Sequence, residues 1–81
     1  MLIDVEVIYE DKGRACRDTW EVEVSDWRGK ALIENAHRST AGMSPHGEAY
    51  TTRIDLEKHL TYTLKMLDLQ FKKIRGIRKS T

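Results

Sequence analysis

The sequence predicts a small α+β domain, in which a small antiparallel β-meander of two or three strands packs against one long C-terminal amphipathic helix. Apolar residues alternate with a period of two near the N-terminus, and they recur every three or four positions between residues 52 and 75. The 81 residues are 40% hydrophobic and 33% charged, which fits one globular domain over residues 1–81. We expect a division into sheet 2–38, loop 39–51, helix 52–75 and basic tail 76–81.

The first two strands are expected to form a hairpin. Residues 2–9 alternate between apolar and polar side chains, and residues 16–24 largely do the same. Between them, Glu10 to Gly13 supplies a turn, because glycine tolerates a positive φ. The apolar faces of the two strands carry Ile3, Val5, Val7, Tyr9, Trp20, Val22 and Val24.

The next segment has two interpretations. Asp26 to Gly29 repeats the glycine-terminated spacing of the first turn, which favours a third strand over residues 30–38. Alternatively, Asp26 caps a short helix whose inner face carries Ala31, Leu32 and Ala36. Glycine in the first helical turn would cost about 1 kcal/mol relative to alanine, so the strand is favoured slightly. Residues 39–51, which include two glycines and the only proline, are expected to form a connector, with a binding lid as the alternative.

The predicted helix over residues 52–75 begins with a capping box formed by Thr52 and Asp55. At 100° per residue its main apolar stripe occupies a band about 80° wide, so we expect it to face the sheet. Gly76 is expected to end the helix in a left-handed conformation, with Ile77 folding back onto Phe71. The stripe consists of Leu56, Leu60, Leu64, Leu67, Phe71 and Ile74.

A second apolar row lies on the opposite side of this helix. Tyr62, Met66 and Leu69 are spaced by four and three residues, where a helix on a solvated sheet needs no apolar side chains. Scattered surface hydrophobics are common and would explain the row without a function. We favour the alternative, burial against a second copy or another protein, with the aliphatic stems of Lys58, Lys65 and Lys72 alongside.

Several functional classes receive no support from the sequence. The single cysteine, Cys16, excludes an internal disulfide and favours a reducing compartment, so we expect a cytoplasmic protein. No apolar run approaches the roughly 18 residues of a membrane span. His37, His46 and His59 lack metal-ligand spacing, and phosphate-binding loops and nucleophile elbows are absent. We therefore expect a protein without catalytic activity, metal or cofactor.

The charge distribution supplies the main functional hypothesis. Residues 1–64 carry 8 basic and 12 acidic residues, whereas residues 65–81 carry 6 basic residues and one acidic residue. A basic end on an acidic body would orient the protein toward nucleic acid or a ribonucleoprotein. The alternative is a protein-interaction module or inhibitor that dimerises or docks on a larger protein through Tyr62, Met66 and Leu69. The residues expected to contact phosphate are Lys72, Lys73, Arg75, Arg78 and Lys79.

Overall fold

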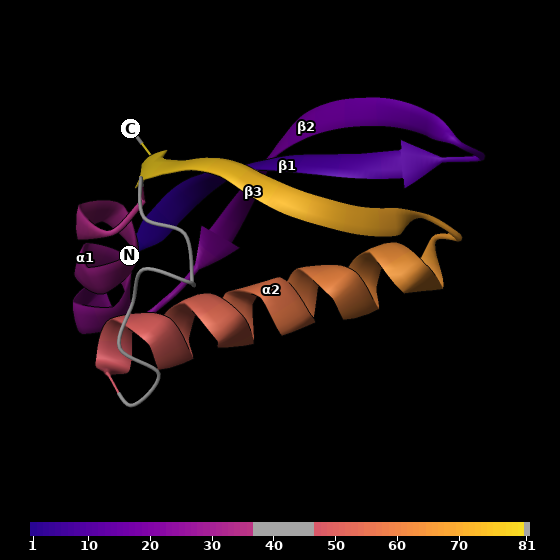
Figure 1. Ribbon diagram of the computed structural model, residues 1–81. Helices are drawn as coiled ribbons and strands as arrows, with labels where there is room; N and C mark the ends of the chain where they lie inside the picture. The colour runs from indigo at the N-terminus through magenta and orange to yellow at the C-terminus, as the bar shows by residue number, and fades with distance from the viewer. Residues whose placement is uncertain (37–46, 81) are drawn as a thin grey trace.

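A computed structural model describes residues 1–36 and 47–80 of the protein. The α+β class is confirmed, because three antiparallel strands form one sheet and two helices accompany it (Figure 1). Strand β1 lies in the centre, and the strand order is β2-β1-β3. Helix α2 runs along one face of the sheet, while α1 lies at one end (Figure 1). The elements are β1 (Leu2–Asp11), β2 (Arg14–Glu23), α1 (Asp26–Glu34), α2 (Glu48–Met66) and β3 (Gln70–Lys79).

The predicted hairpin of β1 and β2 is confirmed. The two strands pair in register from Leu2 opposite Glu23 to Asp11 opposite Arg14. Lys12 and Gly13 alone connect them, with φ angles of 50° and 82°. Positive φ at both central residues is the property of the type I′ turn, whose twist matches that of the strands it joins.

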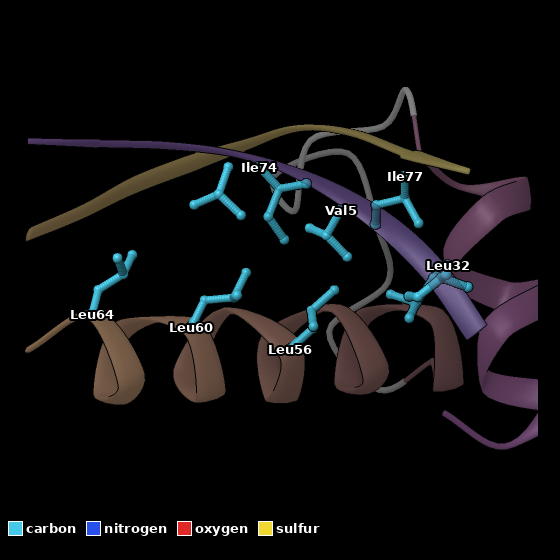
Figure 2. Packing of buried hydrophobic residues seen from close by; sticks show 9 residues of the cluster. Val5, Leu32, Leu56, Leu60, Leu64, Ile74 and Ile77 are labelled. Carbon is cyan, nitrogen blue, oxygen red and sulfur yellow. The ribbon is translucent and has the colours of Figure 1, made fainter. Parts of the chain in front are cut away.

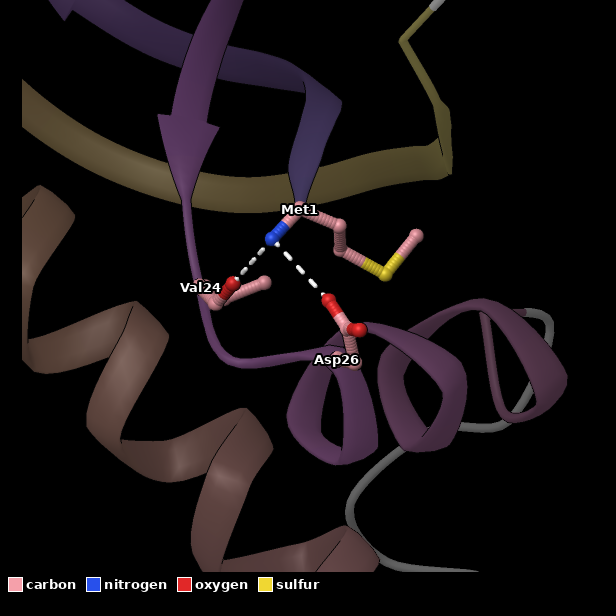
Figure 3. A network of polar contacts seen from close by, with 3 residues as sticks. All are labelled: Met1, Val24 and Asp26. Atoms are coloured by element: carbon pink, nitrogen blue, oxygen red, sulfur yellow. Dashed lines mark hydrogen bonds and ion pairs between the residues drawn. The ribbon is translucent and has the colours of Figure 1, made fainter.

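The favoured third strand over residues 30–38 is wrong, because α1 occupies residues 26–34. Gly29 is the main argument against a helix, and tertiary packing explains its presence. A Cβ atom at Gly29 would overlap the side chain of Met1, so glycine lets the helix lie against Met1 without displacing that side chain. The α-amino group of Met1 donates to the Val24 carbonyl at 2.6 Å and to Asp26 Oδ1 at 3.3 Å (Figure 3).

The predicted helix over residues 52–75 is wrong at both ends. Helix α2 begins at Glu48, within the predicted loop 39–51, whose residues 39–46 lie outside the described part of the chain. It ends at Met66 in a Schellman motif, in which Leu69 N–H donates to the Leu64 carbonyl and Asp68 N–H to the Lys65 carbonyl. Asp68 adopts the left-handed conformation, with φ 59°, that the sequence pattern predicts for Gly76.

The predicted end of the helix and the start of the basic tail form an edge strand, β3, which pairs with β1. Two register shifts along this pairing leave Lys72 and Arg75 as extra residues in β3. Each bulge adds one residue to β3 for the same advance along β1, so the core-facing residues of β3 are three positions apart. The matched pairs are Tyr9 with Phe71, Val7 with Ile74, and Val5 with Ile77.

The core lies between the sheet and α2 (Figure 2). Leu56, Leu60 and Leu64 point from α2 toward the strands, which confirms that part of the predicted stripe. The next predicted member, Leu67, is 61% exposed, because the helix has ended and the chain turns there. The remaining core side chains are Ile3, Val5, Val7, Leu32, Ile74 and Ile77.

Candidate interaction surface

One side of α2 faces away from the sheet and forms the candidate surface. Among the residues that the structure describes, no other element covers this side (Figure 1). Tyr62 is 66% exposed and Met66 is 71% exposed, and Leu67 comes directly after at 61%. Side chains of this size are normally removed from water in part, and Tyr62 and Met66, which lie one helical turn apart, form a local apolar patch. We define the outer face of α2 as Ile54, Asp55, Lys58, Tyr62, Lys65 and Met66.

A shallow groove of about 470 Å³ borders the outer face on the side of β3. Ile54, Lys58, Tyr62 and Lys65 form its helical wall, and Phe71 at the start of β3 contributes the opposite wall. Phe71 is only partly buried, although it packs against the core. The groove therefore extends the apolar patch beyond the helix itself, and the stems of two lysines line it.

The structure separates the three residues of the predicted interface. Tyr62 and Met66 lie on the outer face, one helical turn apart. Leu69 lies beyond the end of α2 and packs against the core, as the residue after a Schellman turn commonly does. Leu67 is the exposed leucine instead, and only the position of the helix end distinguishes it from Leu69.

The five basic residues of the predicted phosphate-binding set all lie on β3, and most face the carboxylates of β1. The side chains of Lys72 and Arg75 lie 3.4 Å and 3.5 Å from Glu10 and Glu6. Arg78 lies 3.7 Å from Asp4. These pairs are solvent-exposed, so each contributes about 0–1 kcal/mol at most. Carboxylates of the adjacent central strand thus offset the charge of three of the five basic residues of β3.

Two members of that set, Lys73 and Lys79, have no carboxylate within 4.0 Å among residues 1–36 and 47–80. Arg17 on β2 reaches Glu6 from the other side, at 3.4 Å. The uncovered face of the sheet is therefore a mixed-charge surface. Carboxylates of β1 lie in the middle, basic residues of β3 lie on one flank, and β2 carries both Arg17 and Glu21 on the other. Sequence reasoning missed this arrangement, because the pairing of β3 with β1 is not visible in the order of the residues.

A second concave site lies between β2, α1 and α2, with a volume of about 210 Å³. Val22, Leu32 and Leu56 supply apolar lining, and Arg28 and His59 are polar residues beside them. Within the described ranges, no three His, Cys, Asp or Glu side chains are placed to hold a metal ion. Two of the three histidines, His37 and His46, lie outside those ranges.

Cys16 lies on β2 and is partly buried, with its sulfur 3.6 Å from the Arg14 carbonyl oxygen. No helix in the described part of the chain is long and apolar enough to cross a membrane. Comparisons of this chain with family models, with curated proteins and with solved structures found no match.

Proposed function

We propose that this protein is a non-catalytic interaction module of the cytoplasm, which binds another protein surface through the outer face of α2. The exposure of Tyr62 and Met66 is the observation that supports the proposal. Burying a side chain of this kind contributes about 1.5–3 kcal/mol, so two of them can anchor a modest interface. Tyrosine is among the residue types that dominate binding energy at the centres of protein interfaces.

The surroundings of these anchors support the same proposal. Lys58 and Lys65 flank Tyr62 and line the groove, so their aliphatic stems can cover an apolar partner while their ammonium groups stay in water. Helices that dock into a groove present apolar anchors three or four residues apart, which is the spacing of Tyr62 and Met66. In contrast, the uncovered sheet face carries mixed charges and few exposed apolar groups.

Site-specific photo-crosslinking in cells tests this proposal. A photoreactive amino acid replaces Met66, and in a matched control it replaces Thr19, which is exposed on the uncovered sheet face. We expect a covalent protein adduct from position 66 but not from position 19. The change Tyr62→Asp in the same chain should remove the adduct, because a charge would enter the apolar contact. The absence of any adduct at position 66, in a chain whose circular dichroism is normal, would refute the proposal.

A second candidate is an anionic partner, either nucleic acid or a ribonucleoprotein, that binds along β3. The net charge of +5 over residues 65–81 favours it, as do Lys73 and Lys79, which pair with no carboxylate in the described part of the chain. The carboxylates of β1 beside Lys72, Arg75 and Arg78 argue against it, so we rank it second.

Binding to mixed RNA and DNA at low salt tests this second candidate. Lys73→Ala with Lys79→Ala should reduce the salt slope by about 2 units, because each lysine would neutralise one phosphate. Undetectable binding by the unaltered chain eliminates the candidate.

A further inference from the structure

We infer that the partner of the outer face of α2 is the same face of a second copy, packed in antiparallel orientation. This inference rests on the proposed function, because it names the occupant of the same surface. Its basis is the order of charges along α2. The exposed acidic residues of the outer side, Glu48 and Asp55, come before the exposed basic residues, Lys58 and Lys65.

An antiparallel pair of these helices is self-complementary in charge. Asp55 lies about three turns before Lys65. A two-fold axis that crosses the helix pair halfway between these residues places each Asp55 opposite Lys65 of the second copy. Two-fold symmetry repeats the contact, and the pair forms twice. A parallel arrangement would instead oppose Asp55 to Asp55 and Lys58 to Lys58. Like charges at those distances disfavour the parallel pair.

The same axis also serves the apolar residues. It places Tyr62 opposite Lys58 of the second copy, where the lysine stem and ammonium group can cover the aromatic ring. Met66 and Ile54 of the second copy then lie at the same level, one on each flank of the contact. Positions 51, 55, 58, 62 and 65 follow one another in steps of four and three, so they lie on one side of the helix. The Asp55–Lys65 pairs and the Tyr62–Lys58 contacts are therefore formed by the same two-fold axis.

The two edges of the sheet are less suited to self-association. Strand β3 carries five basic residues in ten positions, so pairing it with its own copy would oppose like charges. On β2, the backbone N–H of Thr19 already donates to the Asp18 carboxylate at 2.9 Å, in the middle of the strand. Asp18 also accepts from the Trp20 indole at 3.3 Å, which fixes the carboxylate in place. Capped and charged edges are features that discourage strand pairing.

Sedimentation equilibrium with charge reversal tests the inference. The unaltered chain should show a monomer–dimer equilibrium between about 10 µM and about 1 mM at low salt. Asp55→Lys and Lys65→Asp should each raise the dissociation constant of the dimer by about tenfold or more, because each replaces two attractive pairs by two repulsive ones. Glu34→Lys, an equal charge reversal on the exposed side of α1, is the control and should leave the constant unchanged.

An equimolar mixture of the two single variants gives the decisive result. In the mixed dimer, the lysine introduced at position 55 of one chain faces the aspartate introduced at position 65 of the other. The native Asp55 and the native Lys65 face each other at the second contact. The dissociation constant of the mixed dimer should therefore lie within about threefold of that of the unaltered chain, although the constant of each variant alone is raised. This recovery would also show that both variants fold.

Three outcomes overturn the inference. The antiparallel arrangement is contradicted if both charge reversals leave the dissociation constant of the dimer unchanged, or if the mixture of the two variants does not recover dimerisation. A chain that remains monomeric at every concentration contradicts the second copy as occupant. If position 66 still crosslinks to a different protein, the proposed function survives that result; if position 66 gives no adduct, both ideas fail.

Discussion

At the scale of single residues, the left-handed Asp68 sets the end of α2. Its φ of 59° allows its own backbone N–H and that of Leu69 to satisfy the last helical carbonyls, and it turns the chain toward the sheet. A residue with a Cβ atom pays about 1–2 kcal/mol for this conformation, although aspartate tolerates it better than most. Glycine would avoid that strain, at the expense of greater freedom in the unfolded chain.

The first prediction concerns this position. Asp68→Gly should raise the free energy of unfolding by about 0.5–1 kcal/mol, because it relieves the left-handed strain. Urea unfolding measures the change. Lys58→Gly, on the exposed side of α2, is the matched control and should lower the free energy by about 1 kcal/mol. Destabilisation by Asp68→Gly would show that the aspartate side chain itself supports the turn.

The second prediction, also at the residue scale, concerns Arg53. Its side chain is 8% exposed, and its Nε lies 3.4 Å from Glu57 Oε1. Its Nη1 is buried and has no hydrogen-bond partner among the residues that the structure describes. Because desolvation of such a group is expensive, Arg53→Met should keep or raise the free energy of unfolding, by up to about 1 kcal/mol. Thermal unfolding measures it.

Removal of the partner carboxylate should have the opposite effect. Glu57→Gln leaves the Arg53 charge without its counterion and should lower the free energy of unfolding by about 1–2 kcal/mol. Glu34→Gln, on the exposed side of α1, should change it by less than about 0.5 kcal/mol. A greater loss from Arg53→Met than from Glu57→Gln would mean that Nη1 has a partner in the folded protein.

At the scale of elements, α2 presents two unlike faces. Leu56, Leu60 and Leu64 lie in the core, whereas Tyr62 and Met66 lie in water. The helical stripe that the sequence predicts also includes Leu67, which the end of the helix leaves exposed. Leucines that occupy equivalent positions in the sequence pattern therefore contribute differently to the free energy of unfolding, because the helix ends before Leu67.

The third prediction tests this difference with one chemical change at two sites. Leu60→Ala should lower the free energy of unfolding by about 2–5 kcal/mol, because Leu60 is fully buried and its removal leaves a cavity. Leu67→Ala should change it by less than about 0.5 kcal/mol. Denaturant unfolding of both variants provides the comparison. Equal losses at the two positions would place Leu67 in the core and extend the helix beyond Met66.

At the scale of the whole molecule, the fold depends on β3, which the sequence pattern assigns to a helix and a tail. This strand supplies Ile74 and Ile77 to the core and covers one edge of β1. Without it, Val5 and Val7 would lose the neighbours that face them across the ladder. The basic residues of the strand likewise belong to the sheet, and their carboxylate partners come from the opposite end of the chain.

The fourth prediction concerns the end of this strand. Removing residues 76–81 should lower the free energy of unfolding by more than the roughly 1.5–3 kcal/mol of the Ile77 side chain, because ladder hydrogen bonds are lost as well. Amide dispersion in an NMR spectrum should then collapse or broaden. In the full chain, Arg78→Ala with Lys79→Ala should cost less than about 1 kcal/mol. A truncated chain with an unchanged spectrum would show that residues 76–81 are dispensable, as expected of a solvated tail.

The hairpin and the core-facing half of α2 can be predicted, because their local patterns and their tertiary roles agree. The alternation of β1 resumes in β2 after a glycine turn, which favours a hairpin, and Leu56, Leu60 and Leu64 lie on one helical face in any packing. The candidate site is predictable in part. Helical angles identify Tyr62 and Met66, whereas the ion pairs of β3 depend on a strand pairing between distant segments.

The sequence by itself determined the α+β class, the first hairpin and the inner face of the long helix. Only the tertiary structure decided where α2 ends and that a strand succeeds it. Two bulges at Lys72 and Arg75 space Phe71, Ile74 and Ile77 three residues apart, and that spacing imitates a helix. A strand that pairs regularly would have shown a period of two. The free edge of β1, which is supplied by residues about 70 positions earlier, makes the strand more favourable than a continued helix.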